Sequence, residues 1–164
     1  MKCRVLSQHK TDLYRKRKVN EMSKVTVAAM LGVCELKLHF GEEKMKKAAK
    51  EIERGYESLT EKYVTFEDLK ECLAETDGVV IPFSFDPQKS ETLDDQIRIA
   101  EYTQKAFACA VLCTVLCDKF LFGQKKAQQA VKQLCDMFDE FYKSKNTLSQ
   151  YLKELYIKYY IQVS

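Results

Sequence analysis

Apolar residues recur at three- and four-residue spacing along most of the chain, which is the pattern of amphipathic helices. Between residues 42 and 59 they share one helix face with lysines and glutamates between them: Met45, Ala48, Ala49, Ile52, Tyr56 and Leu59. A later stretch repeats the pattern with Ala127, Ala130, Val131, Leu134, Phe138 and Phe141. Gly41 and Gly123 directly precede these stretches, where we expect them to end the preceding helices in a positive-φ conformation.

The two stretches belong to a weak internal duplication with an offset of 82 residues. Segment 28–81 aligns with 110–163 without a gap, and 10 of 54 positions are identical. We therefore predict an all-α fold in which two related three-helix units pack as one helical bundle. The first helices are expected over 24–40 and 92–122, and the second of the first unit over 42–59. The third is expected from Thr65 to about Thr76, with Thr65 and Asp68 as an N-cap pair and Thr147 as the equivalent cap.

The segment between the units contains both prolines of the chain, Pro82 and Pro87. A residue that precedes proline is biased away from helical backbone, so this segment is predicted to be a connector. The predicted organisation is a basic N-terminal arm (1–23), a first helical repeat (24–81), the connector (82–91) and a second repeat (92–164), in one compact domain. Residues 79–82 and 160–163 occupy equivalent positions, and we expect them to pair as short extended segments.

The composition supports a helical domain and narrows the location. Only 5 glycines and 2 prolines are present, too few for the turns of a β-sandwich or barrel. The longest nearly apolar run, 107–117, is about half of the ~20 residues that span a bilayer, so it is interpreted as a buried core helix. No membrane partner is expected, and seven cysteines without paired spacing fit reduced thiols in a cytosolic protein.

The candidate chemistry favours a non-enzymatic protein. Cys109, Cys113 and Cys117 form a stripe on a helix and could join Cys135 or Cys34 around a metal, but zinc sites usually use close-spaced pairs. Buried cysteine also behaves as a small hydrophobe, so core packing is expected, with no metal and no cofactor. The chain has two histidines and no nucleophile elbow, phosphate loop or zinc-protease motif, so no catalytic residue is assigned.

Basic side chains are the candidate partner-binding residues. Residues 1–24 carry eight basic and two acidic side chains, although the net charge of the chain is only +3. Such cations attract phosphates or acidic protein surfaces. The predicted contact residues are Arg15, Lys16, Arg17, Lys18, Lys44, Lys46, Lys47 and Lys50. Tyrosines near the C-terminus indicate either a contact surface or core packing of the last helix: Tyr151, Tyr156, Tyr159 and Tyr160.

Segments 63–71 and 118–126, together with the basic amphipathic helix, resemble parts of small helical proteins encoded by phages and mobile elements of low-GC Gram-positive bacteria. The resemblance covers both repeats. It implies an accessory protein that acts in the cytoplasm of a bacterial host cell by binding host machinery. Inhibitors of host defence, such as anti-CRISPR proteins, are accessory proteins of this type. We therefore predict a non-enzymatic protein that binds a host protein or protein–nucleic acid complex. The alternative is a nucleic-acid-binding phage protein that uses the basic arm, and a homodimer is left open.

Overall fold

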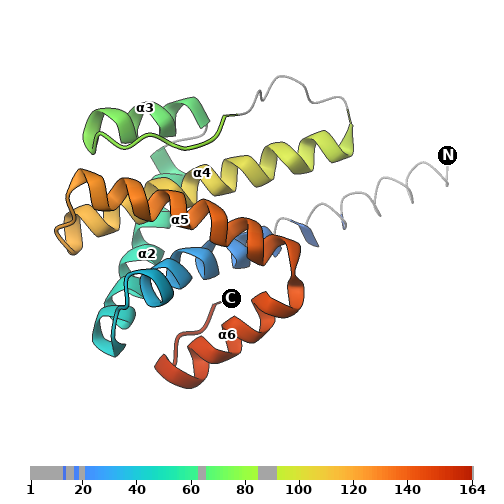
Figure 1. The fold of residues 1–164 in the computed structure, drawn as a ribbon. Helices are drawn as coiled ribbons and strands as arrows, with labels where there is room; N and C mark the ends of the chain where they lie inside the picture. The colour runs from blue at the N-terminus through green and yellow to red at the C-terminus, as the bar shows by residue number, and fades with distance from the viewer. Residues whose placement is uncertain (1–12, 14–16, 19–20, 63–65, 85–91, 164) are drawn as a thin grey trace.

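The computed structural model describes residues 13, 17–18, 21–62, 66–84 and 92–163. Figure 1 shows a bundle of helices, and no β-strand occurs within these ranges, so the all-α prediction is confirmed. Residues 21–32 are helical and continue into a π-helical turn, η1 (Val33–Lys37). The helices that follow are α2 (Glu42–Lys62), α3 (Phe66–Thr76), α4 (Leu93–Lys119), α5 (Gln124–Lys143) and α6 (Lys145–Tyr159). The first helix already includes residues 21–23 of the predicted arm, and Thr65 lies outside the described ranges.

Helix α4 is the central element of the bundle and packs against α2, α3 and α5 (Figure 1). Its start is fixed by a capping box, in which the Thr92 hydroxyl accepts the Asp95 N–H at 3.1 Å and the Asp95 carboxylate accepts the Thr92 N–H at 3.3 Å. By length and composition α4 could cross a membrane, but 61% of its most apolar window is buried in the bundle. The predicted core helix over 107–117 is therefore confirmed.

The two glycines expected to end helices do not adopt positive φ. The left-handed residues at these helix ends are His39 (φ 55°) and Leu121 (φ 58°). The glycines instead begin the next helix, where Gly41 accepts a hydrogen bond from the Met45 N–H at 2.9 Å and Gly123 is the N-cap of α5. The predicted role of Gly41 and Gly123 was therefore wrong, because the chain turns two residues earlier.

Two pairs of helices, whose ends lie 82 residues apart in the sequence, end in the same backbone conformation. His39 and Leu121 lie at the ends of one such pair, and Gly78 (φ 65°) and Tyr160 (φ 57°) at the ends of the other. The residue after each donates its N–H to a carbonyl six residues back: Phe40 to Cys34, Phe122 to Leu116, Val79 to Leu73 and Ile161 to Leu155. The offset thus relates the ends of two pairs of helices, and the duplication of the whole units stays a prediction.

The expected pairing of residues 79–82 with 160–163 does not form. The N–H and C=O of Val80 both bond to the side-chain amide of Gln128, each at 2.8 Å. The Gly78 carbonyl accepts from the Gln124 amide at 2.9 Å. Two glutamines of α5 therefore hold this segment, which buries Val79 in the core.

The predicted cap of the last helix is also corrected. The N-cap of α6 is Ser144, whose hydroxyl accepts the Thr147 N–H at 3.3 Å. Thr147 lies inside the helix, so the cap stands three residues before the predicted one.

Candidate functional site

Helix α2 presents the lysines that the sequence singled out, and a buried stripe divides them between two flanks. Met45, Ala48 and Ile52 are buried and hold the helix against the bundle. One flank, called here the α4 flank, lies beside the end of α4 and carries Lys44, Lys47, Glu51 and Arg54. The other, the tail flank, lies beside the C-terminal tail (160–163) and carries Lys46, Lys50, Glu53 and Glu57.

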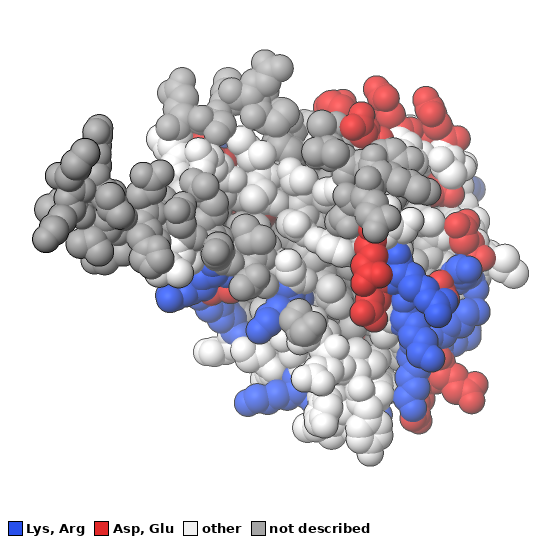
Figure 2. All heavy atoms as spheres, turned by 180° about the vertical axis from the view of Figure 1, so that it is seen from behind, with Lys and Arg blue, Asp and Glu red and all other residues white. Residues whose placement is uncertain are grey.

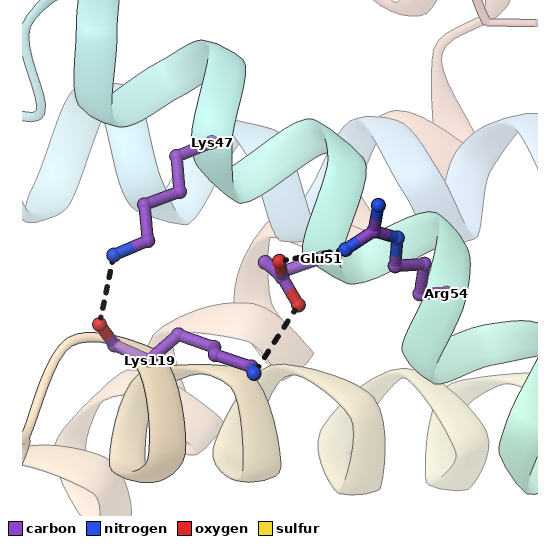
Figure 3. A network of polar contacts seen from close by, with 4 residues as sticks. All are labelled: Lys47, Glu51, Arg54 and Lys119. Carbon is purple, nitrogen blue, oxygen red and sulfur yellow. Dashed lines mark hydrogen bonds and ion pairs between the residues drawn. The ribbon is translucent and has the colours of Figure 1, made fainter.

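The cations of the α4 flank are engaged within the protein, as Figure 3 shows. The Lys47 ammonium donates to the Lys119 carbonyl at 3.3 Å, which satisfies a free carbonyl at the end of α4. Glu51 lies 3.4 Å from the Arg54 guanidinium and 3.9 Å from the Lys119 ammonium. This carboxylate therefore offsets part of the positive charge on the flank.

Aromatic rings lie beneath the lysines of the same flank. Phe40 packs on Phe120 with ring centroids 4.7 Å apart and on Phe122 at 6.5 Å. Lys44 lies over the Phe40 ring at 5.5 Å and Lys47 over the Phe120 ring at 5.1 Å. Such cation–π contacts hold the ammonium groups close to the protein surface.

The tail flank borders an apolar groove of about 530 Å³ between helix 21–32, α2 and the tail. Apolar side chains from helix 21–32 and α2 line it: Val27, Leu31, Ala49, Ile52 and Tyr56. Lys46 and Lys50, two of the predicted contact residues, stand at its edge beside Glu53 and Glu57. The structure thus places these two lysines next to an apolar surface.

The groove has a local cause in the residues of α2. At the offset of 82, the glutamines that hold segment 78–81 against α5, Gln124 and Gln128, correspond to Glu42 and Lys46. These two residues form an ion pair with each other at 3.0 Å. A carboxylate only accepts hydrogen bonds and an ammonium only donates them, so neither side chain can bond both the N–H and the C=O of one tail residue, as Gln128 does for Val80.

Exposed apolar side chains continue the groove past the tail. A second hollow, about 440 Å³, shares Ile161, Gln162 and Val163 with the groove, so the tail lies between the two. Tyr156 (55% exposed), Ile157 (74%) and Tyr160 (77%) lie beside the tail or in it, and we call these three residues the tail patch. Of the C-terminal tyrosines, Tyr151 packs in the core while Tyr156 and Tyr160 are exposed, and a contact surface at the exposed pair stays a prediction.

The π-helical turn η1 places Glu35 beside the last helix, a contact that sequence periodicity did not indicate. Burial, and then the charge of Glu35, raise the pKa of Tyr151. The polar contact with Glu35, and then burial, raise the pKa of Tyr159 to about 12. Both phenols therefore stay protonated at neutral pH, and Tyr159 fixes one border of the groove.

The basic arm is described only at its end. Arg15 and Lys16 lie outside the described ranges, and Arg17 is exposed. Lys18 lies 3.6 Å from Glu21, which also pairs with Lys145 at 3.1 Å. Burial opposes the charge of Glu21, but the two lysines outweigh it and lower the pKa of this carboxyl group. Lys18 is thus linked to the start of α6.

Charges of both signs are interleaved on the α2 side of the molecule. Figure 2 shows basic side chains gathered in one column, with acidic side chains beside it and an uncharged surface below. Along the whole of α2, six basic and six acidic residues give a net charge of zero. Comparisons with protein families, with curated proteins and with solved structures found no match to this chain. The fold is an all-α helical bundle.

Proposed function

We propose that the chain is a non-enzymatic protein that binds another protein through α2 and its C-terminal tail. The observation that carries the proposal is the exposed tail patch beside an apolar groove with lysines at its edge. An aromatic and apolar centre with a charged rim is the usual composition of a protein–protein interface. Contiguous exposed apolar surface on a folded domain also marks interaction sites.

Tyr160 of the tail patch combines an exposed side chain with a left-handed backbone. This residue ends α6 in the left-handed region, with φ 57°, and its N–H bonds to the carbonyls of Leu155 and Tyr156. At the equivalent position of the first repeat stands Gly78, which adopts the same conformation without steric cost. A tyrosine here costs about 1 kcal/mol relative to glycine, and its exposed ring regains little of it by burial.

The charge pattern favours a protein partner over a nucleic acid. Helix α2 has no net charge, and its lysines alternate with the carboxylates of Glu42, Glu51 and Glu53. A phosphate backbone would meet these carboxylates, whereas a protein with mixed charges can pair with both signs. The second candidate, nucleic-acid binding, is supported by the excess of six positive charges in residues 1–24 and would use the run Arg15 to Lys18.

The setting is proposed from the resemblance of segments 63–71 and 118–126. It is a phage or mobile-element accessory protein in a bacterial cytoplasm, with a host protein or protein–nucleic acid complex as target. Inhibition of host defence, as by an anti-CRISPR protein, is the most specific form of this proposal.

A pull-down with the tagged full-length chain tests the proposal. Lysate of a low-GC Gram-positive host is divided into nuclease-treated and untreated halves, and retained proteins are identified by mass spectrometry. We expect a stoichiometric protein that survives nuclease and is lost with the variant Ile157→Ser/Tyr160→Gly. The matched control Leu121→Asn changes an exposed left-handed residue in the turn between α4 and α5 and should retain the partner.

Two results would overturn the assignment. Retention of the partner by the tail-patch variant would remove this surface from the interface. Recovery of nucleic acid alone, lost when Arg15 to Lys18 are made neutral, would favour the second candidate. Circular dichroism of each variant confirms that the helical fold is intact.

A further inference from the structure

Helices α3 and α4 bring two thiols and one carboxylate together, away from the surface around α2. The Sγ atoms of Cys113 and Cys117 and a carboxylate oxygen of Asp77 all lie within 4.8 Å of one another. Cys113 is buried, while Cys117 and Asp77 are partly exposed, so the cluster can be reached from outside. We propose that Asp77, Cys113 and Cys117 bind a soft divalent cation such as Zn²⁺.

The geometry of the cluster suits such an ion. The Cys113 Sγ lies 3.6 Å from the Asp77 Oδ2. In a tetrahedral site with Zn–S of about 2.3 Å and Zn–O of about 2.0 Å, these two ligand atoms lie about 3.5 Å apart. Cysteines four residues apart on α4 supply the other pair, and a water molecule would complete the set. Thiolate ligands select Zn²⁺ and similar ions over Mg²⁺ or Ca²⁺.

The backbone holds Asp77 firmly in this position. Its N–H bonds to the Leu73 carbonyl at 3.1 Å at the end of α3. Gly78 then turns the chain in the left-handed region, and its carbonyl accepts from Gln124 at 2.9 Å. The backbone on both sides of Asp77 is therefore held by hydrogen bonds, which restricts where its carboxylate can lie, as a ligand of a built site requires.

The electrostatic environment of the cluster favours a bound cation, because one carboxylate and two thiols lie together and, among the described residues, no ion pair offsets the carboxylate. Asp77 follows the last residue of α3, at the negative end of the helix dipole, and the last turn of α3 has no basic residue. A divalent cation at this position would offset the charge of the Asp77 carboxylate and, by binding the thiolates, would release the thiol protons.

The proposal departs from the expectation that the cysteine stripe only packs the core. The structure divides the stripe, because Cys109 lies 3.7 Å from the Cys135 Sγ, deep in the bundle. The Lys105 ammonium acts on both of these thiols, and its positive charge would repel a cation there. The stripe therefore offers one favourable metal position, and its third ligand, Asp77, comes from α3, 36 residues before Cys113.

Titration with Co²⁺, a spectroscopic substitute for Zn²⁺, tests the site in the full-length protein. The protein is reduced and stripped of metal by a chelator. We expect thiolate-to-cobalt charge-transfer absorption that saturates at one equivalent and is displaced by Zn²⁺. The variants Cys117→Ser and Asp77→Asn should each weaken binding at least tenfold, whereas Cys72→Ser, a partly exposed cysteine outside the cluster, should not.

Three outcomes would overturn the proposal. The first is absence of thiolate–cobalt absorption at equimolar metal, and the second is unchanged affinity in both Cys117→Ser and Asp77→Asn. The third is loss of the signal in Cys135→Ala instead, which would assign the metal to the other thiol pair. Because this readout needs no partner protein, it fails or succeeds independently of the proposed binding function.

Discussion

The ion pair between α4 and α5 predicts unequal effects when its two members are changed. The Lys105 side chain is 9% exposed, and its ammonium lies 2.8 Å from the Asp139 Oδ1. Asp139 is 45% exposed. The lysine also lies over three aromatic rings at 5.0 to 6.0 Å: Phe83, Tyr102 and Phe138. One member of the pair is therefore enclosed by protein, and the other is half in water.

The burial of the two groups sets the magnitudes. Asp139→Asn leaves a buried ammonium without its anionic partner, which should destabilise the fold by about 2–3 kcal/mol. Lys105→Met keeps the aliphatic stem in its packing and leaves a carboxylate that water can solvate. We expect it to change the free energy of unfolding by less than about 1 kcal/mol. The double variant should recover most of the loss caused by Asp139→Asn.

The contribution of Lys105 to the pH dependence of the free energy of unfolding should have opposite signs in the wild-type protein and in Asp139→Asn. Burial opposes the charge of Lys105, but its hydrogen bond and ion pair with Asp139 outweigh burial and raise its pKa. A raised pKa in the folded state stabilises the protein below the unfolded value, about 10.4, and this contribution is lost as pH rises through the folded value. In Asp139→Asn the two largest contributions that oppose burial are lost, so we expect the folded pKa of Lys105 to fall. The contribution of this lysine then increases as pH rises toward 10.4.

Urea unfolding followed by far-UV circular dichroism measures these differences, and the absence of tryptophan makes helix content the natural signal. For a chain of this length the melting temperature should fall by about 2–4 °C for each kcal/mol lost. Equal destabilisation by Lys105→Met and Asp139→Asn, or a double variant no more stable than Asp139→Asn, would contradict these unequal roles of the two residues.

Two further predictions concern the turn after α3 and the groove. Gly78→Ala should lower stability by about 1–2 kcal/mol, because φ is 65° and the added Cβ would lie 3.0 Å from the Gln124 amide. Gly41→Ala, where a Cβ meets nothing within 4 Å, is the control for thermal unfolding. Glu42→Gln/Lys46→Gln should slow hydrogen exchange of residues 160–163, since free amides can then bond the tail. Unchanged exchange would contradict our explanation of the groove.

Helix positions could be predicted from the sequence because each amphipathic helix buries one stripe. Met45, Ala48 and Ile52 indicated α2 correctly for this reason. The helix ends were less predictable, since local preference assigns the left-handed position to glycine. His39 and Leu121 adopt it instead, and each is followed by a phenylalanine of the aromatic cluster under the α4 flank. At these two turns, packing of the phenylalanine that follows outweighs the preference of His39 and Leu121 for a negative φ.

The candidate surface could be predicted only in part. The lysines of α2 follow from the helix pattern, and so does their division by the buried stripe. The groove does not, because it depends on how a tail more than a hundred residues later docks beside Lys46. Asp77 was missed for the same physical reason: periodicity within α4 finds Cys113 and Cys117, but not a ligand from another helix.

The proposed metal site and the groove beside the tail occupy equivalent positions when the two predicted repeats are aligned at the offset of 82 residues. Asp77, Cys113 and Cys117 correspond to Tyr159, Leu31 and Glu35. In each half the end of the third helix contacts the first helix of its own repeat: Asp77 approaches Cys117, and Tyr159 contacts Glu35. Leu31 and Tyr159 also line the groove. If the halves arose by duplication, core positions such as Leu73 and Leu155 stayed apolar because packing requires it, whereas this partly exposed contact could diverge into a thiol cluster in one half and a groove in the other.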